Sequence, residues 1–220
     1  MLRLHSSPDS ASMAVRMMLE ELGLPHEVRV LDRDRDLASP DYRALHPLGL
    51  IPALETPDGT MFETAAILLW LADRHPAAGL APAPDSAARA DFLKWLFFIS
   101  TNLHPHMLNL FYSDRAAGPG NEQAVIAASR ARISLLLDAL EAAAARRPDW
   151  LSPDRPTLLG YYLSMLLRWM GSFEAGDLRR VTLTDYPALH AVAAYLETRP
   201  SAQKVAADEG LGPRPFTEPC

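Results

Sequence analysis

The chain has 220 residues, of which 49% are hydrophobic and 22% charged, so it is long enough to bury one large core or two modest ones. Its net charge is −6 and its 21 Lys and Arg residues are scattered, which argues against nucleic acid or an acidic membrane as the main partner. The single cysteine, Cys220, is the last residue, which excludes an internal disulfide and a cysteine-ligated metal site. With no apolar targeting segment and no run of about 18 apolar residues, we expect a cytoplasmic protein.

Strand and helix signals alternate over the first 76 residues. In order, these signals predict a strand at 2–5, a helix at 12–22 closed by Gly23, a strand at 27–32, a strand at 51–56 and a helix at 63–74. The dipeptide Asp58-Gly59 is a favoured two-residue hairpin turn. We therefore expect residues 1–76 to form a βαβ unit followed by a hairpin and a final helix.

The pattern changes near residue 80. Residues 77–86 are rich in proline, glycine and alanine, and we expect a linker there. Apolar residues then recur at three and four positions over the segments 86–112, 121–146, 157–170 and 187–199. We therefore expect an α/β domain followed by an all-helical domain at 87–220.

Pro52 lies at the start of an otherwise apolar strand signal. A proline removes a ladder donor, so it belongs at a sheet edge, at a strand start or at a bend. A cis bond between Ile51 and Pro52 would turn the N–H and C=O of Ile51 outward, where an extended peptide can pair with them. The alternative is a trans proline that simply begins an edge strand.

The pair Glu63-Thr64 opens the helix at 63–74. Helix N-termini present unpaired N–H groups that bind a carboxylate, and Thr64 can add a hydroxyl donor. Glu63 can accept from an ammonium group, so the pair suits an amino-acid head group. The alternative is an ordinary pair of N-terminal capping residues.

The segment LGLIPALETPDGTMFETAAILLWLADRH resembles the glutathione-binding region of cytosolic glutathione S-transferases, and WLFFISTNLHPHM and ALHAVAAYLETRPSAQK resemble later parts of that family. The resemblance implies a thioredoxin-like domain, an all-helical domain and a homodimer. It implies that Ile51 binds the cysteinyl part of glutathione, that Pro52 is cis, and that Glu63 with Thr64 holds the γ-glutamyl group. It also implies a role in detoxification. We expect no metal, because no acidic or cysteine residue lies at helical ligand spacing from the histidines of HPHM.

The region HSSPDSASMAVRM departs from that family, whose members activate the thiol with a hydroxyl or cysteine near the first helix. Asp9 and Ala11 stand where relatives carry the serine or the cysteine. Ser10 and Ser12 are the candidate hydrogen-bond donors to the thiolate, with Ser7 or backbone N–H groups as alternatives. All three serines also suit a turn or a helix cap, and an ionised Asp9 would oppose the thiolate.

His104 matches a histidine of bacterial relatives that approaches the glutathione site from the helical domain. It is a candidate to assist the thiolate, and His106, on a different helical face, is a candidate to contact the peptide. The alternative for both is a packed, non-catalytic histidine. Pro105 should bend this helix.

Two further departures concern positions 48 and 160. In the segment HPLGL many relatives carry a lysine or glutamine that contacts the glycine carboxylate of glutathione, and Leu48 and Leu50 cannot pair with it. The alternatives are weaker glutathione binding or another basic residue in that role. Gly160 follows Thr157 where relatives complete a capping box, so reciprocal capping is lost.

Aromatic and apolar residues offer a pocket for an acceptor, although such helical stripes are usually core. They are Trp95, Phe98, Met107, Phe111, Tyr112, Tyr161 and Trp169. We expect a transferase that conjugates the glutathione thiolate to an apolar electrophile. The alternatives are a glutathione-dependent disulfide or peroxide reductase, and a non-catalytic binding or scaffold protein with this fold.

Overall fold

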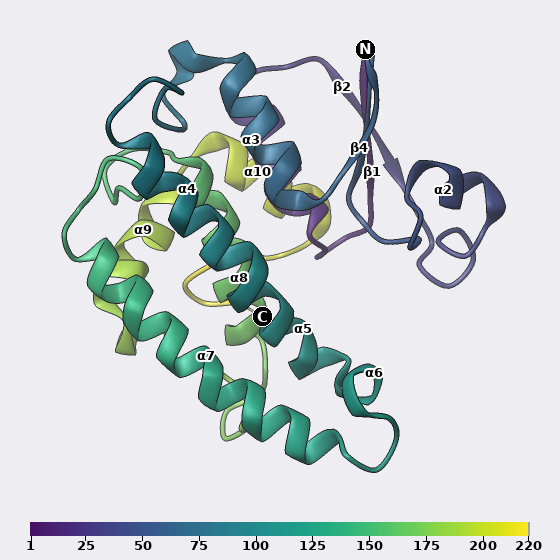
Figure 1. Ribbon diagram of the computed structural model, residues 1–220, viewed down its shortest axis with the longest axis vertical. Coiled ribbons are helices and arrows are strands. Elements are labelled where there is room, and N and C mark those ends of the chain that lie inside the picture. Colours follow the sequence, from purple (N-terminus) through teal and green to yellow (C-terminus); the bar gives the residue numbers. More distant parts are fainter. Residues whose placement is uncertain (220) are drawn as a thin grey trace.

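In the computed structural model, which describes residues 1–219, a four-stranded sheet lies at one end of a helical bundle (Figure 1). Cys220 lies outside the described residues. The strands are β1 (Leu2–Ser6), β2 (His26–Val30), β3 (Ala53–Thr56) and β4 (Gly59–Phe62). They are ordered β2-β1-β3-β4; β1 pairs parallel with β2, and both other pairs are antiparallel.

Helices cover both faces of the sheet. On one face lie α1 (Ser12–Glu21) and α3 (Thr64–Arg74), whose buried side chains share a core with Leu4 and Leu54. The short helix α2 (Pro40–Leu45) lies on the opposite side of the strands (Figure 1), where Leu31, Tyr42 and Ala53 form a second, small core. This arrangement is the thioredoxin-like fold, which confirms the expected fold class.

The β3–β4 hairpin is confirmed, but its turn is one residue earlier than predicted. Thr56 pairs with Gly59, so Pro57 and Asp58 are the two turn residues and Gly59 is the first residue of β4. Proline fixes the backbone angle favoured at the first central position of a turn, and glycine is favoured at the fourth position. The Thr56 hydroxyl accepts from Asp58 N–H and donates to the Gly59 carbonyl, which holds the turn closed.

Beyond residue 75 the described chain is helical. After a 3₁₀ turn at Pro76–Ala78, its helices are α4 (Arg89–Phe98), α5 (His104–Phe111), α6 (Ser113–Ala117), α7 (Glu122–Ala144), α8 (Leu158–Gly171), α9 (Pro187–Glu197) and α10 (Pro200–Glu209). A further 3₁₀ turn, Leu183–Asp185, precedes α9. The predicted segments are confirmed, whereas α2, α6 and α10 were not predicted. None of the described helices is long and apolar enough to cross a membrane.

A π-helical turn, Ile99–Leu103, joins α4 to α5. Pro105 lies two residues after it and has no N–H to donate to the preceding turn, so the regular hydrogen-bond ladder is interrupted there. The Thr101 hydroxyl donates to the Phe97 carbonyl at 2.6 Å. The bend expected at Pro105 stays a prediction, and the irregularity that the structure shows beside it is one wider turn.

The two parts of the chain pack together through α8, every residue of which is buried. Helix α1 contacts both α8 and α10, and their side chains belong to one continuous core. At the start of α8, the Thr157 hydroxyl accepts from Gly160 N–H at 3.0 Å, so half of the expected capping box is retained. A Cβ on Gly160 would lie 2.8 Å from Leu196 Cδ1, so glycine lets α8 approach α9 closely.

Candidate functional site

A cleft of about 1200 Å³ lies between one end of the sheet, where β1, β2 and β4 finish and β3 begins, and helices α5 and α8. It contains most of the residues that the sequence nominated. From the sheet-containing part it is lined by residues 8–11, Arg33, Arg43, residues 48–52 and the pair Glu63-Thr64, and from the helical part by His104, Pro105, Met107, Leu108, Phe111, Tyr112, Arg115 and Trp169, among others.

The loop before β3 forms the floor of the cleft. The Ile51-Pro52 bond is cis, as predicted, and the ladder with β1 begins only at Ala53. The buried Tyr42 hydroxyl donates to the Leu50 carbonyl at 2.7 Å and fixes the loop from behind; burial raises the pKa of that phenol to about 12, so it remains protonated. Gly49 has φ +61° and lies so close to the backbone of Leu37 that a Cβ would be 2.3 Å from Leu37 O.

The N-terminus of α3 opens into the same cleft. Thr64 is its first residue and is buried, while Glu63 precedes it with φ +71° and an exposed side chain. The Glu63 side chain makes no capping hydrogen bond to the helix. A non-glycine residue in the left-handed region is uncommon and is concentrated at functional sites. The carboxylate is therefore available to a ligand beside the free N–H groups of α3.

Three serines form a chain of hydrogen bonds at the start of α1. The Ser12 hydroxyl lies 2.6 Å from the Ser10 hydroxyl and 2.7 Å from that of Ser6, and Ser10 donates to the Ser7 carbonyl at 2.6 Å. Ser10 lines the cleft, whereas Ser12 is fully buried and lies behind it. The Ser7 hydroxyl accepts from Arg33. Of these four serines, Ser10 is the one that lines the cleft, where its side chain can reach a ligand.

Asp9 lies at the cleft but is held by partners from the helical part. Its carboxylate accepts from Arg168 Nε at 3.1 Å, from Arg168 Nη2 at 3.0 Å and from Trp169 Nε1 at 2.8 Å. The sequence analysis anticipated Asp9 as an opposing anion and missed these partners, which lie about 160 residues away along the chain. The sequence near Arg168 does not identify its partner. An arginine within an apolar helix indicates that a partner is needed, but not which residue provides it.

His104 reaches the cleft from the start of α5. Its Nδ1 is 2.8 Å from the Tyr162 hydroxyl, and its ring packs against the rings of Tyr162 and Trp169. Burial lowers the pKa of His104 to about 4, so the imidazole is neutral at physiological pH. Burial also keeps the Tyr162 phenol protonated, and the tautomer of the neutral ring sets which of the two groups donates in this hydrogen bond.

His106 does not line the cleft. Burial together with Arg132 of α7 lowers its pKa. Helical residues two positions apart point about 200° apart around the axis, so His104 and His106 cannot both face one ligand.

Four of the seven nominated apolar residues form the outer wall of the cleft: Met107, Phe111, Tyr112 and Trp169. The other three lie elsewhere. Trp95 packs against Phe98 and Trp150, and the Tyr161 hydroxyl donates to Glu21 Oε2 in the interface between α1 and α8. The cleft therefore combines a polar floor with an apolar outer wall.

Three arginines line the cleft: Arg33, Arg43 and Arg115. Arg33 is held by the Ser7 hydroxyl and by the carbonyls of Pro8 and Asp9. The Arg115 guanidinium lies 3.9 Å from the centre of the Tyr112 ring, at the apolar end of the cleft. Leu48 and Leu50 are exposed on its rim, so cationic and apolar groups share this surface.

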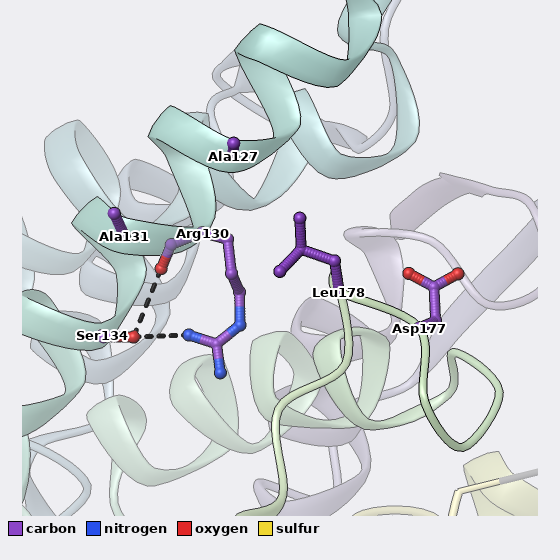
Figure 2. Close-up of a pocket in the computed structure, with 6 residues that line it drawn as sticks. All are labelled: Ala127, Arg130, Ala131, Ser134, Asp177 and Leu178. Carbon is purple, nitrogen blue, oxygen red and sulfur yellow. Dashed lines mark hydrogen bonds between the residues drawn. The ribbon is translucent and has the colours of Figure 1, made fainter.

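A second, shallow depression of about 500 Å³ lies between α7 and the loop after α8 (Figure 2). Its polar groups already have partners within the chain. Figure 2 shows Arg130 hydrogen-bonded to Ser134, and Asp177 is paired with Arg179, which lowers the pKa of Asp177 to about 2. The depression lacks the convergent polar groups that a small-molecule site requires.

Comparison with known proteins agrees with the geometry of the larger cleft. A family model described as the N-terminal domain of glutathione S-transferase matches residues 10–74. Glutathione S-transferase GST-4.5 of Xanthomonas campestris pv. campestris is 31% identical over 96% of this chain and 100% of its own. The chain belongs to the glutathione S-transferase family.

Other members of the glutathione S-transferase family match over the same extent. GstA of Escherichia coli O157:H7 is 28% identical over 96% of this chain and 100% of its own. A sphingomonad glutathione S-transferase, solved in complex with glutathione, is 30% identical with a TM-score of 0.79 and covers 96% of this chain and 100% of that one. A glutathione transferase structure from Methylococcus capsulatus has a TM-score of 0.81 at 28% identity.

Proposed function

We propose that the protein is a glutathione transferase that joins the thiolate of glutathione to an apolar electrophile. The main observation in support is that two features line the same cleft. They are the backbone at Ile51-Pro52 and the N-terminus of α3 with Glu63 and Thr64. An extended peptide can pair with the backbone of Ile51. Its γ-glutamyl carboxylate can then accept from Thr64 and the α3 N–H groups, while Glu63 accepts from its ammonium.

The thiol of such a ligand lies near Ser10, at the start of α1. Ser10 is the proposed hydrogen-bond donor to the sulfur, and the N-terminus of α1 adds a favourable partial charge. The Ser10 hydroxyl must then leave the Ser7 carbonyl, to which it donates in the unliganded chain. Ser12 lies behind it and positions the Ser10 oxygen through the 2.6 Å contact between the two hydroxyls.

His104 supplies a second donor. We assign the ring the tautomer in which Tyr162 donates to Nδ1 and Nε2 carries the proton, so that it presents a neutral N–H rather than a positive charge to the ligand. A neutral donor can stabilise the sulfur during attack without holding the thiolate as a tight ion pair. The attack forms a carbon–sulfur bond and needs no covalent intermediate on the protein.

Basic residues from the sheet-containing part can hold the other end of glutathione. Leu48 and Leu50 provide no charge, but Arg33 and Arg43 line the cleft on the same side as Ile51. We assign the glycine carboxylate to these two arginines. The apolar wall of Met107, Phe111 and Trp169 is then left for the electrophile.

A cytoplasmic homodimer completes the proposal. On α3, the side chains of Ile67, Leu68 and Leu71 are buried, yet Leu69 and Trp70 on the remaining face are apolar and only partly buried. A second copy of the chain covers such a face.

The proposal is tested with glutathione alone and then with an electrophile. Titration calorimetry measures binding, and thiolate absorbance against pH gives the thiol pKa of the bound complex. Ser10→Ala should raise that pKa by about one unit, whereas affinity should stay nearly unchanged. Ser12→Ala is the matched control, and a larger effect there would move the donor role to Ser12.

Product analysis separates the candidate reactions. Mass spectrometry of the mixture should show a thioether conjugate of glutathione. Glutathione disulfide as the main product would instead indicate a reductase that uses two glutathione molecules, and binding without turnover would indicate a scaffold protein.

A further inference from the structure

A buried cation of the helical part faces the loop that activates the thiol. Arg168 is 2% exposed and donates two hydrogen bonds to the Asp9 carboxylate, from Nε at 3.1 Å and from Nη2 at 3.0 Å. Trp169, the next residue of α8, donates to the same carboxylate. Three donors from one buried helix therefore fix the direction in which a loop carboxylate points.

The main chain of Asp9 is held as firmly as its side chain. Its N–H donates to Glu209 Oε2 at 2.9 Å, and Arg33 donates to its carbonyl at 3.2 Å. Its φ of +49° is uncommon for a residue with a side chain. Such a conformation persists only where the surroundings impose it, and Ser10 follows directly on this residue.

We propose that Arg168 is a positioning residue for the glutathione thiolate, acting through Asp9. It neutralises the carboxylate that borders the sulfur site and keeps it turned toward α8, so that Ser10 and the N-terminus of α1 act on the sulfur without an opposing anion. This inference rests on the proposed function. Physically, an unpaired carboxylate beside the sulfur would disfavour the thiolate, whereas the neutral pair leaves it nearly undisturbed.

The charged groups around Asp9 and Arg168 determine how replacing either residue should change the pKa of the bound thiol. Asp9 faces Arg168 of α8, Glu209 of α10 and Arg33 of the loop after β2. Arg16 of α1 lies beside Glu209 on the side away from the cleft. Replacing Asp9 by asparagine removes a negative charge from beside the sulfur, and replacing Arg168 by methionine removes a positive one. The two variants should therefore shift the thiol pKa in opposite directions.

The experiment measures the pKa of glutathione bound to the full-length protein by thiolate absorbance. Asp9→Asn keeps the hydrogen bond from Trp169 and should lower the thiol pKa by about one unit, which is about tenfold in the thiolate equilibrium. Arg168→Met should raise it by a similar amount, Arg168→Lys should raise it less, and the double variant should lie near the wild type.

Glu21→Gln is the matched control. Glu21 is a carboxylate of α1 that is paired with Arg199 of the helical part at 2.7 Å, but it lies outside the cleft. The Glu21→Gln substitution should leave the thiol pKa unchanged, although it also breaks an ion pair between the sheet-containing part and the helical part. If Arg168→Met does not fold, Arg168→Lys takes its place, because lysine keeps the charge but loses the two-nitrogen contact and should still raise the thiol pKa above that of the wild type.

The outcomes separate this inference from the proposed function. If wild-type protein binds glutathione as a thiolate but Asp9→Asn fails to lower its pKa, or both single variants shift it in the same direction, the role of Arg168 is refuted and the transferase proposal stands. If wild-type protein does not bind glutathione, both are refuted together.

Discussion

Replacing His104 by asparagine should make the protein less sensitive to acid. The ring is buried against Tyr162 and Trp169, and burial lowers its pKa from the ordinary 6.5 to about 4. In the unfolded chain the histidine takes up a proton near pH 6.5, whereas in the folded chain it does not until about pH 4. The unfolded state therefore binds more protons in this interval, and the free energy of unfolding falls as the pH falls.

The linkage relation gives the size of the effect. Between pH 7 and pH 4.5, a histidine with these two pKa values removes about 2 kcal/mol from the free energy of unfolding, after allowance for the small exposed part of its ring. His104→Asn carries no titrating group and keeps an oxygen near the position of Nδ1. Its stability should therefore fall by about 2 kcal/mol less than that of the wild type over the same interval.

Urea unfolding at pH 7.0 and pH 4.5 measures this difference, and an NMR titration of the imidazole observes the protonation directly. Tyr162→Phe is the control: it removes the hydroxyl but leaves the ring buried, so its pH dependence should follow the wild type. Equal losses of stability in the wild type and His104→Asn, or an imidazole that titrates near pH 6.5, would refute the reasoning.

The remaining predictions concern the ligand, the packing and the assembly. Glu63→Ala and Thr64→Ala should each weaken glutathione binding by about 1 to 3 kcal/mol in calorimetry, because each removes a charge-assisted hydrogen bond; unchanged affinity would place the head group elsewhere. Gly160→Ala should destabilise the fold by about 1 to 2 kcal/mol in urea despite the better helix propensity of alanine, because its Cβ would lie 2.8 Å from Leu196 Cδ1, and Leu196→Ala should relieve that cost. Light scattering at micromolar concentration should give the mass of a dimer, and a monomer mass would contradict the proposed pairing through α3.

Local chemistry made the sheet and the backbone of the cleft floor predictable. Pro52 allows the cis bond that precedes β3, and Thr64 begins α3 directly after Glu63, so both features can be located from a few neighbouring residues. The hairpin was predicted for the same reason, and its turn was misplaced by one residue because Pro57 competes with Gly59 for control of the turn.

The outer wall was harder to predict because of the π-helical turn at Ile99–Leu103. One extra residue in a turn rotates everything after it by about 100° relative to a regular helix. Trp95 and Phe98 before the turn and Met107 after it therefore cannot be assigned to one face by a period of 3.6 residues. The partners of Asp9 were unpredictable for a different reason, since only the tertiary fold brings α8 to the loop.

The small core beneath α2 has a consequence for ligand binding. Only Leu31, Tyr42 and Ala53 are fully enclosed there, so few apolar contacts resist local opening of the segment from residue 31 to residue 50. The Tyr42 hydroxyl holds the Leu50 carbonyl, which means that such opening also releases the backbone on which the peptide would rest. Amide protons of α2 should then exchange with solvent earlier than those of α8, and a bound peptide should slow them by drawing the population toward the closed form. The residence time of the ligand is accordingly coupled to how often this segment opens.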